Sequence, residues 1–233
     1  LRGIYEYVNE RGTTVATYGI STKIAERKIL LEDMCSEYSL SGVIIMGMKI
    51  QDEYLIEAGR LDIPCVAIDT ALQGENIATV MTNDEAAFEE ITDYVLDQGH
   101  REVVLIKGKE DAEVTHKRYL GFKRAVEKHR IDINDIGIFD CHFNEAKAFE
   151  NTKGIHRKTI KKIKETTAFI CMSDLMALGV CRAVSECGYS VPEDFSVTGF
   201  DGLYTLDYIK PGITTIKPEY QGKMEYVGIK GFK

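Results

Sequence analysis

The chain has 233 residues, of which 44% are hydrophobic and 28% are charged, and its 37 acidic and 29 basic side chains give a formal net charge of −8. This length supports one large or two modest domains with a buried core, and the composition excludes a disordered tail, a collagen-like chain and a disulfide-stabilised miniprotein. No apolar run approaches the ~18–20 residues that span a bilayer, and the acidic balance argues against a surface that binds nucleic-acid phosphates.

Helix-like and strand-like patterns alternate along the first part of the chain. We expect helices over 1–12 and 24–38, with a strand between them at 13–18. Two short apolar segments, 42–46 and 64–69, are bounded by turn residues. Because they are apolar on both faces, they are typical of strands in a parallel sheet that is covered by helices.

From residue 82 the alternation becomes regular. Thr82 and Glu85 have the spacing of a capping box, which predicts a helix that begins there and is closed by Gly99. The expected elements that follow are strand 103–106, helix 115–129, strand 136–140, helix 151–164, strand 168–172, helix 174–187 and strand 195–199. Strands that alternate with helices predict an α/β fold with parallel sheets. At this length, two smaller α/β lobes are at least as plausible for so many units as one open sheet.

Cysteine usage and the absence of enzyme motifs limit the possible functions. The six cysteines form no CxxC and no zinc-like pairing with histidine, which predicts reduced thiols, a cytoplasmic protein and no metal site. The sequence has no glycine-rich phosphate loop, no GxSxG elbow and no HExxH. We therefore expect neither a cofactor nor enzymatic activity.

Side chains suited to binding a ligand follow the expected strands of the second half. They are Arg118, Phe143, Ser173, Asp174 and Asp201. Because the carboxyl ends of parallel strands meet at one edge of a sheet, these residues are expected to converge. A guanidinium and carboxylates form charge-assisted hydrogen bonds with neighbouring hydroxyls, and an aromatic ring covers the apolar face of a sugar. The set therefore predicts a sugar-type site.

Four of these residues also have a structural interpretation. Arg118 could form a surface ion pair, and Phe143 could pack within its loop. Asp174 could act only at the start of a helix, and Asp201 could stabilise a turn before Gly202. The residues alone therefore indicate a two-lobed binding protein and leave the role of each side chain open.

Seven short motifs follow one another along the chain. They are SGVII (41–45), IPCVAID (63–69), DQGHR (97–101), KRYLGF (117–122), CMSDLMALG (171–179), VPEDFSVTGFD (191–201) and PGITTI (211–216). In this order they resemble the lactose-repressor/galactose-repressor (LacI/GalR) family of transcriptional regulators. The resemblance extends over nearly all of the chain to about Pro218.

The resemblance implies a fold of two Rossmann-like lobes with parallel sheets, like that of type I periplasmic binding proteins. The N-terminal lobe is expected to hold residues 1–98 with a return segment at about 217–224. The C-terminal lobe is expected to hold residues 99–216 with a final segment at about 225–233.

The resemblance also implies a function and partners. A small effector, a sugar or a sugar derivative, would bind between the lobes of a cytoplasmic homodimer and alter its affinity for operator DNA. The DNA would be contacted only through an N-terminal helix-turn-helix headpiece outside this sequence, and no membrane would be involved. The alternative is an exported sugar-binding protein of a transport system, which a signal peptide upstream would distinguish from a regulator.

Three residues match effector positions of the family, and two more stand at or near such positions. Arg118 matches the arginine that grips the effector, and Asp201 matches the aspartate of a glycine–aromatic–aspartate motif. Phe143 matches an aromatic residue that often stacks on the ligand. Ser173 stands where the family usually has asparagine, and Asp84 falls near an effector position of the first lobe.

Two places depart from the family's usual length. The family begins this core with a strand and loop that would precede Leu1, and it continues with a long helix after the position of Pro218. Here the final residues, 221–233, follow almost at once. We therefore expect sequence to be missing at both places.

Overall fold

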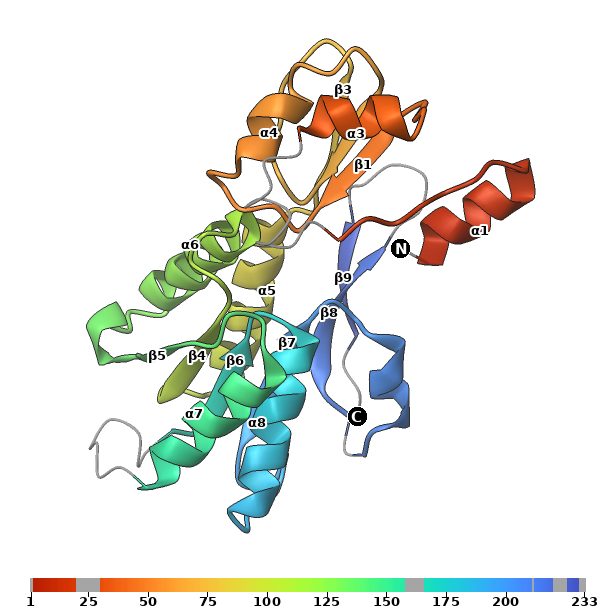
Figure 1. Ribbon diagram of the computed structural model, residues 1–233. Coiled ribbons are helices and arrows are strands. Elements are labelled where there is room, and N and C mark those ends of the chain that lie inside the picture. The colour runs from red at the N-terminus through yellow and green to blue at the C-terminus, as the bar shows by residue number, and fades with distance from the viewer. Residues whose placement is uncertain (1, 20–29, 158–165, 211, 220–225, 231–233) are drawn as a thin grey trace. The chain divides into compact units, whose positions relative to one another are not determined.

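The computed structural model describes most of the chain (Figure 1). The described residues are 2–19, 30–157, 166–210, 212–219 and 226–230. The chain divides into two compact units, Leu1–Gly42 and Val43–Lys233. No helix among the described residues is long and apolar enough to cross a membrane.

The described residues of the first unit form two helices, α1 (Arg2–Arg11) and α3 (Leu31–Glu37). Gly12, at a φ of +64°, follows α1 as the sequence predicts. The strand predicted at 13–18 is wrong: this segment has no regular structure, and no strand described in the unit offers it a hydrogen-bonding partner. Most of the predicted helix 24–38 before α3 lies outside the described residues.

The second unit begins with a three-stranded parallel sheet in the order β1-β2-β3. Its strands are β1 (Val43–Met46), β2 (Cys65–Ile68) and β3 (Ile77–Val80), and α4 (Glu53–Ala58) lies between the first two in sequence. The apolar segments at 42–46 and 64–69 thus form strands as expected. The sequence analysis did not find β3, whose central Ala78 and Thr79 are exposed, or α4, which has only six residues and shows no clear helical period.

A six-stranded sheet, in the order β5-β4-β6-β7-β8-β9, makes up the rest of the unit. Its strands are β4 (Val103–Lys107), β5 (Gly137–Asp140), β6 (Ala168–Cys171), β7 (Ser196–Phe200), β8 (Thr214–Glu219) and β9 (Tyr226–Lys230). All neighbours pair in parallel except β8 and β9, which are antiparallel. The carboxyl ends of the first five strands therefore share one edge of the sheet.

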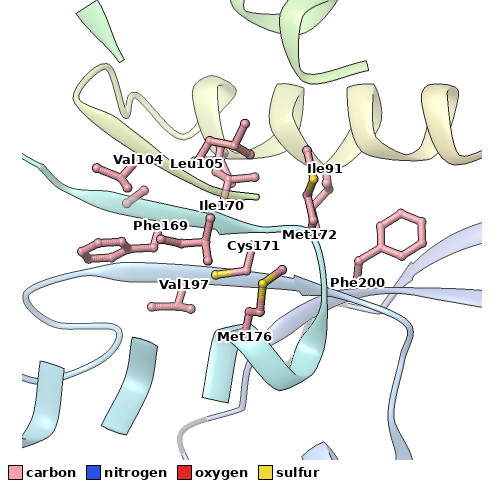
Figure 2. Packing of buried hydrophobic residues seen from close by; sticks show 14 of the residues in the cluster. Ile91, Val104, Leu105, Phe169, Ile170, Cys171, Met172, Met176, Val197 and Phe200 are labelled. Carbon is pink, nitrogen blue, oxygen red and sulfur yellow. The ribbon is translucent and has the colours of Figure 1, made fainter. Parts of the chain in front are cut away.

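Two pairs of helices cover this sheet. They are α5 (Asp84–Asp97) with α6 (Glu113–Lys128), and α7 (Glu145–Arg157) with α8 (Asp174–Glu186). Figure 2 shows α5 on one side of the sheet and α8 on the other, with Ile91 and Met176 reaching toward the strands. The buried face of α5 packs in this core although its residues precede the expected lobe boundary at 98. The division into lobes stays a prediction.

The helix starts differ from those expected in three places. Asn83, not Thr82, caps α5 by accepting a hydrogen bond from the N–H of Ala86, because the Thr82 hydroxyl donates instead to Asp84 Oδ2 at 2.8 Å. The capping box predicted from Thr82 is therefore wrong. Helix α6 begins two residues earlier than predicted, and α7 begins at Glu145 rather than 151. Residues 158–165, the predicted end of α7, lie outside the described residues.

Candidate functional site

Arg118 connects several groups at the carboxyl edge of the six-stranded sheet. Helix α6 carries its side chain, which is 7% exposed. Its Nε donates to Asp84 Oδ1 at 2.7 Å, and its Nη1 donates to the carbonyl oxygen of Met172 at 2.5 Å. Asp201 Oδ1 lies 3.8 Å from the same Nη1. Three residues predicted from widely separated motifs are thus brought together.

Two aromatic rings lie beside this guanidinium. The Cζ atom of Arg118 is 3.8 Å from the ring centroid of Phe200 and 6.0 Å from that of Phe143. The sequence analysis identified Phe143 but missed Phe200, whose signal was its position at the end of a strand, directly before Asp201. We call Asp84, Arg118, Phe143, Phe200 and Asp201 the Arg118 cluster.

The position of Phe143 depends on a glycine. A β-carbon on Gly108 would lie 2.1 Å from Cζ of Phe143, so the ring occupies space that only glycine leaves free. Phe143 itself has a φ of 57°, an uncommon conformation for a residue with a bulky side chain. The loop after β5 is therefore held in an unusual conformation that places an aromatic ring near Arg118.

Ser173 lies at the same edge of the sheet but has a structural task. It is the N-cap of α8, and its hydroxyl accepts a hydrogen bond from the N–H of Met176 at 3.3 Å. The side chain is almost completely buried. The hydroxyl oxygen of Ser173 already accepts a hydrogen bond within the helix. The effector contact expected for this residue stays a prediction.

The carboxyl group of Asp201 has an unusual acidity. Burial raises its pKa to about 7, while the positive charge of Arg118 opposes the rise and the negative charge of Asp174 adds to it. The side chain keeps an exposed fraction of 40%, so it remains accessible to a solute. It can therefore accept or donate a hydrogen bond near neutral pH.

Asp69 is a further candidate that the sequence analysis did not select. It directly follows β2 and has a φ of 58°. Burial and the negative charge of Asp84 raise its pKa, whereas Arg118 and Lys117 lower it. Its available signal was its position at the end of an apolar strand, the same signal that identified Asp201.

The cluster offers side chains of several chemical kinds. Among the described residues, no group of three or more His, Cys, Asp or Glu side chains could hold a metal ion. One guanidinium, exposed and buried carboxylates and two aromatic rings instead provide donors, acceptors and an apolar surface. This combination suits a small molecule that carries hydroxyl groups.

Comparison with known proteins identifies the family. The family model described as "Periplasmic binding protein-like domain" matches residues 92–224, more than half of the chain. The chain belongs to this family. Within it, the core is of the LacI/GalR type, as the motifs predict, and the α/β fold with two groups of parallel strands is also confirmed.

The relatives and solved structures agree with this assignment. The transcriptional repressor PurR of Histophilus somni is 29% identical over 185 residues, which are 79% of this chain and 54% of the repressor. The chain thus spans about half the length of the curated relatives it matches. A LacI-family regulator from Enterococcus faecium with bound ribose has a TM-score of 0.78 at 22% identity, covering 93% of this chain and 76% of the other.

A structure of the lac repressor dimer bound to operator and the anti-inducer ONPF has a TM-score of 0.75 at 22% identity, covering 93% of this chain and 73% of the other. At these identities the solved structures show the fold. The relatives are transcriptional repressors, in agreement with the prediction that the chain is not an enzyme, and they do not favour the transport alternative. The effector role of the five residues stays a prediction.

Proposed function

We propose that the chain is the ligand-sensing and dimerisation core of a cytoplasmic LacI/GalR-type transcriptional regulator. Its effector is a small molecule, a sugar or a sugar derivative, that binds at the Arg118 cluster. The observation that carries this proposal is the buried pair of Arg118 and Asp84, which fixes a guanidinium beside Asp201 and two aromatic rings.

Four members of the cluster have a defined part in binding. Asp84 orients the guanidinium of Arg118, whose remaining N–H groups donate to effector hydroxyls. The partly exposed carboxyl of Asp201 bonds neighbouring hydroxyls. Phe143 covers the apolar face of the ring. Such a site binds by hydrogen bonding and packing and needs no cofactor.

The regulatory step depends on differential binding. The effector must bind one arrangement of the regulator more tightly than another, since otherwise it shifts no equilibrium. In the full-length homodimer this difference changes operator affinity through a helix-turn-helix headpiece that this sequence does not include. The repressor relatives and the dimeric, operator-bound lac repressor support this part of the proposal.

A ligand screen by thermal unfolding tests the proposal. We would add D-ribose first, because the Enterococcus faecium structure contains it, and then other sugars and sugar phosphates. A ligand at 100 times its dissociation constant stabilises the folded chain by ~2.7 kcal/mol. The expected result is a saturable rise in the unfolding temperature with at least one sugar.

Two variants locate the response. Asp201→Asn, which keeps the size of a partly exposed side chain, is expected to reduce the ligand-induced shift, and Arg118→Ala is expected to abolish it. Glu193→Gln removes an exposed carboxylate from the turn that precedes β7 and is the matched control. An undiminished shift in both site variants would show that the effector binds elsewhere, and the lack of a shift with any sugar would contradict the effector class.

A further inference from the structure

Asp174 is completely buried, yet it is not a member of the Arg118 cluster. Its two carboxyl oxygens have separate partners: Oδ1 accepts a hydrogen bond from the Thr215 hydroxyl at 2.6 Å, and Oδ2 accepts one from the N–H of Leu203 at 2.7 Å. A β-carbon on Gly199 would lie 2.2 Å from Oδ1. The carboxylate of Asp174 therefore fills the space that Gly199 leaves, and it connects the start of α8 to β8 and to the loop after β7.

The same contacts hold the loop that carries Asp201. The N–H of Asp201 donates to the carbonyl oxygen of Ile216 at 3.0 Å, and the N–H of Gly202 donates to Oγ1 of Thr215 at 3.3 Å. With the hydrogen bond from Leu203, three consecutive N–H groups of this loop are fixed. The Thr215 hydroxyl accepts a hydrogen bond from the N–H of Gly202 and donates one to the carboxylate of Asp174, so it links the loop to the buried carboxylate.

The loop needs this support because its backbone is unusual. Asp201 has a φ of 122° and Gly202 a φ of 63°. A β-carbon on Gly202 would lie 2.5 Å from Cβ of Lys217, so the position requires glycine for space as well as for conformation. Such conformations persist only where the surroundings determine them, and two of the three N–H contacts come from the pair Asp174 and Thr215.

We propose that Asp174 and Thr215 are positioning residues for effector binding, which hold the 201–203 loop so that the carboxyl of Asp201 faces Arg118. Neither residue needs to touch the effector. The backbone N–H of Asp174 also bonds the Asp201 carboxyl, so that Asp174 supports the same group from its main chain and from its side chain. This inference rests on the proposed function only in naming Asp201 as an effector contact.

The chain offers a matched set of threonine variants. Thr215→Val removes the bridging hydroxyl with little change of shape, and Thr215→Ser restores the hydroxyl. Thr198→Val is the control, because Thr198 is 3% exposed in the neighbouring strand β7 and its hydroxyl has no hydrogen-bond partner among the described residues. Replacing an unpaired buried hydroxyl by a methyl group is close to neutral for stability.

The first measurement is the titration of the Asp201 carboxyl by ¹³C NMR, with Asp201→Asn used to assign the signal. The charges that act on this carboxyl are those of Arg118, Asp174 and Asp84, and its pKa in the wild type is about 7. In Thr215→Val the released loop admits water, so we expect the pKa to fall toward about 3.9, the value of a free aspartate. Thr215→Ser and Thr198→Val should titrate like the wild type. A wild-type titration in folded Thr215→Val would overturn the proposal.

Asp174→Ala provides a second variant if Thr215→Val does not fold. Alanine has no side-chain acceptor, so Thr215 and the Leu203 N–H both lose their partner. We expect faster hydrogen exchange at the Leu203 N–H in this variant than in Thr198→Val. Equal exchange rates would contradict the proposal.

The last measurement is the affinity for D-ribose by calorimetry. We expect Thr215→Val to weaken binding about tenfold, because the displaced Asp201 carboxyl loses about one charge-assisted hydrogen bond to the ligand. Thr215→Ser and Thr198→Val should bind like the wild type. If the wild type does not bind D-ribose, that choice of effector is wrong, while the Asp201 titration still decides whether Thr215 positions the loop. Tight binding by folded Thr215→Val would contradict the inference alone.

Discussion

The guanidinium of Arg118 contacts a buried carboxylate, a partly exposed carboxyl group and two aromatic rings. Arg118 is 8% and Asp84 is 1% exposed in their side chains, and the two are joined at 2.7 Å. A buried pair of this kind adds little net stability, but the loss of one partner leaves an uncompensated charge that costs roughly 3–5 kcal/mol. The pair is thus better suited to fixing the direction of the guanidinium than to stabilising the fold.

The raised pKa of Asp201 predicts a pH-dependent stability. An aspartate whose pKa is about 7 in the folded state binds its proton more tightly there than in the unfolded chain. Its stabilising contribution is complete below the unfolded pKa of about 4 and is lost as the pH rises through about 7. We expect Asp201→Asn to flatten the fall in stability between about pH 4 and 7, as measured by urea unfolding. Glu193→Gln should keep the wild-type slope, and an unchanged slope in Asp201→Asn would contradict the assignment.

At the scale of elements, glycines set the distance between paired helices. A β-carbon on Gly121 of α6 would lie 2.1 Å from the carbonyl oxygen of Glu85 in α5, and one on Gly179 of α8 would lie 2.3 Å from that of Glu145 in α7. Both contacts are with backbone atoms, which cannot move without separating the helices. The close approach of each pair over the sheet therefore depends on a single missing methyl group.

Replacing these glycines by alanine should destabilise the protein, although alanine is usually the more favourable residue in a helix. Alanine in a helix is normally more favourable than glycine by about 0.8–1 kcal/mol. Gly179→Ala should instead lower the free energy of unfolding by about 1–3 kcal/mol, because the added methyl group overpacks the interface. Gly154→Ala in α7 is the control: nothing lies within 4 Å of its β-carbon position, so it should stabilise. Urea unfolding measures both, and a stabilising Gly179→Ala would contradict the close approach.

At the scale of the whole second unit, contacts join segments that follow strands of different sheets. The N–H of Ile50, after β1, donates to the carbonyl oxygen of Asp111 at 2.9 Å, and Lys49 forms an ion pair with the Asp111 side chain at 3.0 Å. The N–H of Ala71, after β2, donates to Glu113 Oε2 at 2.7 Å. The loop after β4 and the start of α6 thus meet loops of the three-stranded sheet.

The ion pair in this region should contribute little to stability. The side chains of Lys49 and Asp111 are 62% and 47% exposed, and water screens exposed pairs strongly. We expect Lys49→Ala to lower the free energy of unfolding by less than about 1 kcal/mol, similar to Lys123→Ala, which removes another exposed pair. Chemical unfolding of both variants checks this, and a loss above about 2 kcal/mol from Lys49→Ala alone would contradict a screened surface pair.

Local patterns determined most of the second unit. The strands β4 to β7 lie close to their predicted positions because they are short apolar segments, most of them buried on both faces. Helices α6 and α8 are long enough to show the periodicity of a buried face, whereas α7 begins before its predicted start. The Thr82 capping box and the strand at 13–18 failed for a shared reason. A local pattern shows only that a group could form a hydrogen bond. In the folded chain the Thr82 hydroxyl bonds Asp84 instead of the helix start, and the segment 13–18 has no described strand to pair with.

The sequence by itself determined the α/β class, the family resemblance and the convergence of Arg118 and Asp201, because parallel strands end at one edge. It also proposed Phe143 and Asp84, whose positions beside Arg118 only the structure shows. The role of Asp174 was decided by tertiary structure alone. Its partners Thr215 and Leu203 are 41 and 29 residues away. The pairing of β7 with β6 on one side and with β8 on the other brings the start of α8, the Asp201 loop and the Thr215 hydroxyl together.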